Sequence, residues 1–399
     1  IAPPVTEGGV VAVGKDGTVL RLRPTGIWQR DEVPTADALV SLWGGGGQRL
    51  YAVGGDATGI LLDYDGANWP DMVEFVKAAD RLGVGFAWTA EAWGMETIAP
   101  LAYLAPITQN IKLGTGIMQI SARTPAMTAM TALTMARLSG DRFCLGLGVS
   151  GPQVVEGLHG DGFDKPLGRL REYIALVKQG ISGERLTSAG PHYVLPRPGG
   201  QGKALKLSMP PNPSIPLYLA TLGPKMLELT GEVADGWLGT SFIPEAADQV
   251  IPHIRAGAER AGRSLTDIDM QVNATIEVGD DVEKLLDKYR PAAAFTLGAM
   301  GSASTNFYNA AYSRAGWADT AAQVQSLWVS GDKEGAVRAV PDEFLLSTYM
   351  IGTEKMVTER ISAVHAAGIN TLRLAPVGRT AAQMIDNLER LKPLVTSVG

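Results

Sequence analysis

The sequence predicts an α/β protein: a (β/α)8 barrel with insertions that follows a short β-rich segment. From residue 59 onward, short apolar segments alternate with amphipathic segments of helical spacing, which is typical of a parallel sheet. The apolar segments number about eight, the strand count of such a barrel. With 399 residues, 45% of them hydrophobic, the chain can also bury a core of this size. A doubly wound parallel sheet is the alternative fold.

The N-terminal segment differs in its sequence pattern from the rest of the chain. Val10–Trp28 resembles Leu50–Trp69 at an offset of 40 residues, and both contain short alternating strands with Gly and Asp turns. This pattern, seen across residues 1–69, resembles a fragment of a β-propeller blade. Only about one and a half repeats are present, whereas a propeller needs about four blades. We therefore predict that residues 1–58 form a β-rich extension, either a remnant or a docking module, and that residues 59–399 form the barrel.

The expected barrel strands follow the apolar segments in chain order. They are Gly59–Tyr64, Gly85–Ala90, Ile111–Met118, Phe143–Val149, Ile215–Ala220, Gly236–Thr240, Ile268–Ile276 and Thr371–Leu374. The first of these can equally be the last strand of the β-rich extension. Gly183–Pro213, rich in Gly and Pro, indicates an excursion that contains a hairpin.

Helix signals lie between these strands. Pro70–Leu82 begins with Pro and is followed by Gly83, and Pro125–Leu138 follows the N-cap candidate Thr124. Further helices are expected at Met95–Thr108, Lys165–Lys178, Ala246–Ala261, Glu354–Ala367 and Thr380–Leu394, with one more that opens at Gly223. Ile111–Gly151 then reads as strand, helix and strand, a parallel βαβ unit whose two strands lead into glycine-rich loops.

Composition excludes several classes of protein. A net charge of −6 and a pI near 5.4 argue against nucleic acid or an anionic membrane as partner. The single cysteine, Cys144, excludes an internal disulfide and cysteine-rich zinc sites, and the four histidines show no metal-ligand spacing. Neither a membrane-spanning run nor a signal-peptide pattern is visible, so we expect a cytoplasmic protein without a metal site.

Three motifs could carry chemistry. Gly146–Gly151 matches G-x-G-x-x-G, but Pro152 and a polar loop follow where a dinucleotide fingerprint enters a helix. Leu222–Lys225 opens a helix, where free N–H groups, the dipole and a lysine could bind an anion, although an ordinary Pro-started helix fits as well. Glu91 ends the second strand, where barrel active sites lie, and could act there or form a salt bridge at the rim.

Longer motifs are spread over more than four fifths of the chain. They are Phe86–Gly94 (FAWTAEAWG), Ile111–Ala132, Leu138–Gly157, Lys165–Tyr173, Leu222–Lys225 with Ala234–Trp237, and Met300–Phe307 (MGSASTNF). From about Gly59 onward the chain thereby resembles the luciferase-like oxidoreductases, most of all the branch that uses the deazaflavin coenzyme F420. The resemblance implies a (β/α)8 barrel with the coenzyme across the carboxyl ends of the strands.

The resemblance also implies roles for particular residues. Gly116, Ile117 and Met118 correspond to a bulge, with an unusual peptide at Gly116–Ile117, that supports the deazaflavin. Gly148, Val149, Ser150 and Gly151 correspond to the loop beside the ring, and Thr221, Leu222, Gly223, Pro224 and Lys225 to a phosphate-binding turn. Glu91 corresponds to an acidic residue near the reactive face, which could handle a proton or orient the ring, and Trp93 is a candidate wall of the substrate site.

Two features depart from the family pattern. Ala92 stands where related deazaflavin dehydrogenases often carry His, so their acid/base pair is not evident, and the N-terminal extension is foreign to the family. We predict an F420-dependent oxidoreductase that exchanges a hydride with a small organic substrate and forms a homodimer, as is common in the family. An FMN-dependent monooxygenase of the same fold and a non-catalytic binding protein are the alternatives.

Overall fold

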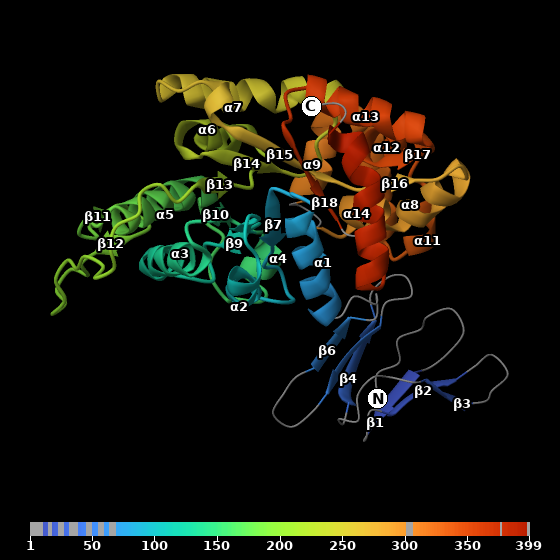
Figure 1. Ribbon diagram of the computed structural model, residues 1–399, viewed down its shortest axis with the longest axis horizontal. Coiled ribbons are helices and arrows are strands. Elements are labelled where there is room, and N and C mark those ends of the chain that lie inside the picture. The colour runs from blue at the N-terminus through green and yellow to red at the C-terminus, as the bar shows by residue number, and fades with distance from the viewer. Residues whose placement is uncertain are drawn as a thin grey trace. The chain divides into compact units, whose positions relative to one another are not determined.

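The computed structural model describes residues 69–300, 306–375 and 377–396, together with the backbone of six strands between residues 11 and 63 (Figure 1). Part of the Met300–Phe307 motif and most loops of the N-terminal extension lie outside the described residues. By its internal contacts the chain divides into two compact units, Ile1–Phe75 with Pro376–Leu388 and Val76–Ala375 with Glu389–Gly399. The predicted division after residue 58 stays a prediction.

The larger unit is built on a parallel sheet whose strands follow chain order. The strands are β7 (Phe86–Thr89), β8 (Lys112–Thr115), β10 (Phe143–Gly148), β13 (Leu217–Leu219), β14 (Gly236–Gly239), β15 (Asp269–Ala274) and β18 (Thr371–Leu374). The short β9 (Met118–Gln119) pairs with β10 beside β8. Seven of the eight predicted strands thus pair in parallel, and their order never reverses as it would in a doubly wound sheet.

The remaining predicted strand lies in a different sheet. β6 (Ile60–Asp63) pairs antiparallel with β5 (Leu50–Gly54), which pairs with β4 (Leu39–Gly44). A second meander joins β1 (Val11–Gly14), β2 (Thr18–Leu22) and β3 (Trp28–Asp31). The ambiguity of Gly59–Tyr64 is therefore resolved toward the β-rich segment, and no strand that the structure describes pairs with the outer edges of β7 and β18.

Helices follow most strands, as the barrel fold requires. They are α1 (Trp69–Arg81), α2 (Ile98–Leu104), α3 (Pro125–Ser139), α5 (Pro166–Ile181), α6 (Pro224–Val233), α7 (Ile251–Arg260), α13 (Glu354–Ala366) and α14 (Ala381–Thr396). The predicted N-cap is present at α3, where Thr124 accepts from the Met127 N–H, and Gly140 ends this helix in the left-handed region. A two-stranded hairpin, β11 (Ser188–Ala189) with β12 (Val194–Leu195), lies in the predicted excursion.

The sheet separates two sets of side chains. Met270, Val272 and Leu372 pack outward against the helices around it. Cys144, Tyr218 and Leu238 project to the other face, together with Phe86, Trp88 and Ile117. A Cβ built on Gly114 would lie 2.2 Å from the Trp88 ring, so glycine there admits the indole into this inner face.

A helical insertion precedes the last strand. It contains α8 (Val282–Gly298), α9 (Phe307–Tyr312), the π-helical turn η4 (Ser313–Trp317), α10 (Ala318–Val329), α11 (Lys333–Arg338) and α12 (Asp342–Thr348), between the paired strands β16 (Ile276–Val278) and β17 (Met350–Gly352). These helices share a hydrophobic cluster of their own around Phe344. Among the described residues, no helix is both long and apolar enough to cross a membrane.

Candidate active site

The loops after β8, β10 and β13 leave the same edge of the sheet, because neighbouring parallel strands place their carboxyl ends together. Gly116–Met118, Gly148–Gly151 and Thr221–Lys225 lie at these three strand ends, where Met118 opens β9 and where Pro224 and Lys225 open α6. Segments far apart in the sequence therefore meet on the face where (β/α) barrels carry their active sites. We call this face the mouth of the barrel.

The loop after β8 has the expected unusual backbone. The peptide bond between Gly116 and Ile117 is cis, which confirms that prediction. Ile117 packs over the neighbouring strand, since a Cβ built on Gly148 would lie 3.0 Å from its Cδ1. The Ile117 carbonyl accepts a hydrogen bond of 3.0 Å from the Glu91 N–H. The loop is thus fastened to the segments after β7 and β10.

Glu91 follows β7, and its carboxylate is already engaged. The side chain is 7% exposed and forms an ion pair with Arg123. Its Oε2 also accepts from the Gln119 N–H at 3.0 Å. Arg123 reaches Glu96 as well, with 3.0 Å between Nη2 and Oε2. Glu91 therefore holds the loop that contains Ile117, and its role in proton transfer stays a hypothesis.

Arg123 was not among the predicted site residues. It stands just before the N-cap of α3, and 32 residues separate it from Glu91. Its carbonyl accepts from the Tyr173 hydroxyl at 3.1 Å, which anchors it from α5 as well. No local pattern pairs an arginine with a carboxylate at that distance in sequence, so this contact could only be found in the fold.

Two polar atoms beside this loop are buried and have no partner among the described residues. They are Gln119 Oε1 and Ser121 Oγ. A buried polar group without a hydrogen bond costs free energy, so a bound polar ligand would stabilise both. The Ile120 N–H meanwhile donates to the Gly148 carbonyl at 3.1 Å, which places these atoms beside the β10 loop. The loop therefore fits a polar ring system.

The segment after β10 is open at the backbone. Ser150 has a φ of 59°, and Gly151 is the N-cap of α4 (Pro152–Val155). A Cβ built on Gly151 would meet no other atom within 4 Å. A helix of 4 residues does not provide the long helix of a dinucleotide fingerprint. Gly146, in contrast, serves packing, because a Cβ there would lie 1.8 Å from the Thr115 carbonyl oxygen.

The turn after β13 presents the start of α6. Gly223 is the N-cap and Pro224 the first helical residue, and no side chain caps the helix. The N–H groups of Lys225 and Met226 consequently lack intrahelical acceptors. They lie at the positive end of the helix dipole. The Lys225 side chain is 75% exposed and pairs with Glu228 at 2.9 Å. The backbone of this turn, more than its lysine, fits an anionic group.

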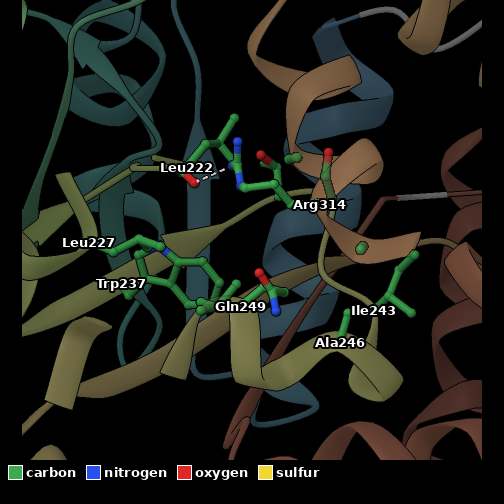
Figure 2. Close-up of a pocket in the computed structure, with 12 residues that line it drawn as sticks. Leu222, Leu227, Trp237, Ile243, Ala246, Gln249 and Arg314 are labelled. Carbon is green, nitrogen blue, oxygen red and sulfur yellow. Dashed lines mark hydrogen bonds between the residues drawn. The ribbon is translucent and has the colours of Figure 1, made fainter. Parts of the chain in front are cut away.

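A pocket adjoins this turn, and Figure 2 shows Arg314 at its edge, joined to Leu222 by a hydrogen bond. The Arg314 guanidinium donates a hydrogen bond of 2.9 Å to the Leu222 carbonyl. The Trp237 Nε1–H donates one of 3.0 Å to the Thr221 carbonyl. Apolar side chains supply most of the remaining lining, among them Leu227, Ile243, Ala246 and Val250. The helical insertion thus contributes a cation to a mostly apolar pocket.

Two predicted site residues are placed less directly. Trp93 is 59% exposed on the loop after β7. Met118 is fully buried, and its sulfur accepts from Thr128 Oγ1 of α3 at 3.6 Å. Only the backbone of Met118 can therefore take part at the mouth.

Comparison with known proteins places this fold in a family. The family model described as luciferase-like monooxygenase matches residues 51–371. The chain belongs to this family. The match includes all three loops at the mouth of the luciferase-like barrel.

Individual relatives extend along most of the chain. A Mycobacterium tuberculosis protein provisionally named as a coenzyme F420-dependent oxidoreductase is 40% identical, over 84% of this chain and 98% of its own length. The 5,10-methylenetetrahydromethanopterin reductase of Archaeoglobus fulgidus is 29% identical, over 77% and 90%. Among solved structures, the coenzyme F420-dependent tetrahydromethanopterin reductase of Methanopyrus kandleri superposes with a TM-score of 0.67 at 23% identity, covering 81% of this chain and 94% of that one. The solved structure supports the luciferase-like barrel fold.

Proposed function

We propose that this chain is a coenzyme F420-dependent oxidoreductase that transfers a hydride between the deazaflavin and a small organic substrate. The names of the M. tuberculosis and M. kandleri relatives support this cofactor. The observation that carries the proposal is the loop after β8. The backbone of Gly116 and Ile117 is hydrogen-bonded to Thr89 and Glu91 on one side, and Ile117 packs against Gly148 on the other, next to the open backbone of Gly151.

Each mouth loop has a distinct task in this proposal. The bound deazaflavin supplies the hydride chemistry, while the protein binds, orients and excludes water. Gly116 and Ile117 support the ring, and Gly148–Gly151 lie beside it. The free N–H groups at the start of α6 bind its phosphate. Glu91 holds the supporting loop through Arg123 and Gln119.

The pocket beside Leu222 adjoins the start of α6. There Trp237, Leu227 and Val250 offer apolar contacts, and Arg314 from the insertion offers a cation next to the proposed phosphate site. Trp93, exposed on the loop after β7, is retained as a candidate wall of the substrate site. A homodimer and a cytoplasmic location remain predictions from the resemblance and the composition.

The test is a fluorescence titration of the purified chain with F420 and, separately, with FMN. We expect saturable F420 binding and weak or no FMN binding. Gly148→Ala should weaken F420 binding about tenfold, because the new Cβ displaces Ile117 from the ring support. Gly202→Ala is the matched control, since Gly202 has an ordinary φ and open space around it. Tight FMN binding without an F420 response would favour the monooxygenase, and binding of neither would favour a non-catalytic protein.

A further inference from the structure

The ends of β15 and β18 carry polar side chains on the inner face of the sheet. Asn273 pairs in register with Arg373, and residues paired across parallel strands project from the same face. Val272 and Leu372 beside them pack outward against the helices. Because successive residues of a strand alternate between faces, Asn273 and Arg373 project inward. Asn273 is exposed, so this part of the inner face is accessible.

Arg373 reaches across the neighbouring strand. Its Nη2 donates to the Gly239 carbonyl at the end of β14, at 2.8 Å, although β15 lies between β14 and β18. The guanidinium thus lies over the inner face of β15 and close to its carboxyl end. Gly239 follows Leu238, which belongs to the inner cluster with Ile117 and Trp88. The guanidinium of Arg373 and Ile117, which is proposed to support the deazaflavin ring, are therefore on the same side of the sheet.

The positive charge of Arg373 has no paired carboxylate among the described residues. Its guanidinium Nε is buried and has no hydrogen-bond partner within the part of the chain that the structure describes. Burial lowers the pKa of its guanidinium to about 10, so it is still charged at neutral pH. Buried charges in proteins are normally paired, and buried polar atoms normally hydrogen-bonded.

We propose that Arg373, flanked by Asn273, binds an anionic oxygen group of the substrate, a carboxylate or a phosphate, at the mouth of the barrel. A planar guanidinium with free donors is the side chain best suited to such a group. The inference rests on the proposed function and narrows it to acidic substrates. The cofactor's phosphate is assigned to the start of α6, so it does not require Arg373.

The test compares matched pairs of small ligands by calorimetry, with and without saturating F420. Acetate and benzoate are compared with acetamide and benzamide, and inorganic phosphate is added as a further probe. We expect at least one carboxylate to bind the wild-type chain ten times or more tightly than its amide. Arg373→Gln should remove that preference, and Arg373→Lys, which keeps the charge, should retain part of it.

Arg142→Lys is the matched control. Arg142 is also a partly buried arginine bound to carbonyl oxygens, those of Ile111, Ala105 and Thr108, but it lies at the start of β10 and not at the mouth. This variant should keep the carboxylate preference. Circular dichroism before each titration establishes that the variants are folded.

Three outcomes would overturn the proposal. The first is that carboxylates and amides bind the wild-type chain equally, or that neither binds. The second is that the preference for carboxylates survives in Arg373→Gln. The third is an F420 dissociation constant raised tenfold or more in Arg373→Gln, which would assign the arginine to the cofactor. Failure of F420 to bind at all contradicts the proposed function instead, because the titrations without F420 still report on Arg373.

Discussion

At the scale of single residues, the Glu91–Arg123 pair distinguishes a positioning role from a catalytic one. The pair and the Gln119 N–H bond fix the loop that carries Ile117. We expect Glu91→Gln and Arg123→Met each to weaken F420 binding about tenfold, equivalent to about 1.4 kcal/mol. Because both changes break the same contact, the double variant should be little worse than either single one.

The measurement is the F420 dissociation constant by fluorescence, with the pH profile of turnover once a substrate is known. Arg338→Gln serves as control, since its exposed side chain pairs with Glu334 of the same helix, α11, and not with the loop. Unchanged F420 affinity in Glu91→Gln, together with loss of one limb of the pH profile, would instead make Glu91 a proton-transfer group.

Residue-level prediction from the sequence succeeded where a motif fixes the backbone. The unusual peptide at Gly116–Ile117 was expected and is present. A salt bridge of Glu91 was one of two expected alternatives, but its partner Arg123, the reach of Arg373 and the position of Arg314 were not expected. These contacts join residues distant in sequence, and arginine side chains are long enough that their partners are decided by the folded neighbourhood.

At the scale of elements, Asp80 connects α1 to the segment before β8. Its carboxylate is 7% exposed and accepts the N–H groups of Gln109, Asn110 and Ile111 at 2.7, 2.8 and 2.7 Å. Burial raises the pKa of Asp80, but these three donors and Arg142 outweigh it, so the pKa lies below its usual range. A carboxylate bound in this way stabilises the folded state mainly in its charged form.

We expect Asp80→Asn to reduce the free energy of unfolding by about 2 kcal/mol at neutral pH, because the amide cannot accept at both of its positions. The folded pKa is depressed, so this stabilisation is complete above the unfolded pKa of about 3.9 and disappears as pH falls through the folded pKa. Urea unfolding should show a constant gap between wild type and variant from about pH 7 to about pH 5 that narrows below about pH 4. Glu74→Gln, exposed on the same helix, is the control. A gap independent of pH would contradict the assignment.

Most elements were predictable from the sequence because their signals are local. The strands from β7 to β18 carry apolar runs, and α3 carries both of its caps. Gly59–Tyr64 could not be assigned from such a signal, since its short apolar run Ile60–Leu62 suits a strand of the β-rich segment and a barrel strand equally. Its pairing with β5 is decided by which partner strand is available, and a periodicity argument does not contain that information.

At the scale of the whole molecule, the β-rich segment raises the question of how the parallel sheet is completed. Seven strands of an eight-stranded barrel pair in order, and the described strands leave the outer edges of β7 and β18 without partners. An exposed strand edge is a liability for a folded protein. The family match begins at residue 51, within β5, so it includes β6.

Two deletions separate the roles of these segments. Removing residues 1–57 takes away β5, the partner of β6, and leaves Ile60–Asp63 free to pair elsewhere. We expect this variant to fold and to bind F420 with unchanged affinity, as a remnant outside the barrel would allow. Removing residues 1–64 also deletes Ile60–Asp63, and we expect it to lower the thermal unfolding midpoint and weaken F420 binding relative to the shorter deletion, because Ile60–Asp63 can then no longer pair with the edge of β7 or β18. Circular dichroism and F420 fluorescence measure both effects.

Equal behaviour of the two deletions would show that Ile60–Asp63 contributes nothing to the barrel. Collapse of the shorter deletion would instead make the β-rich segment a required part of the fold.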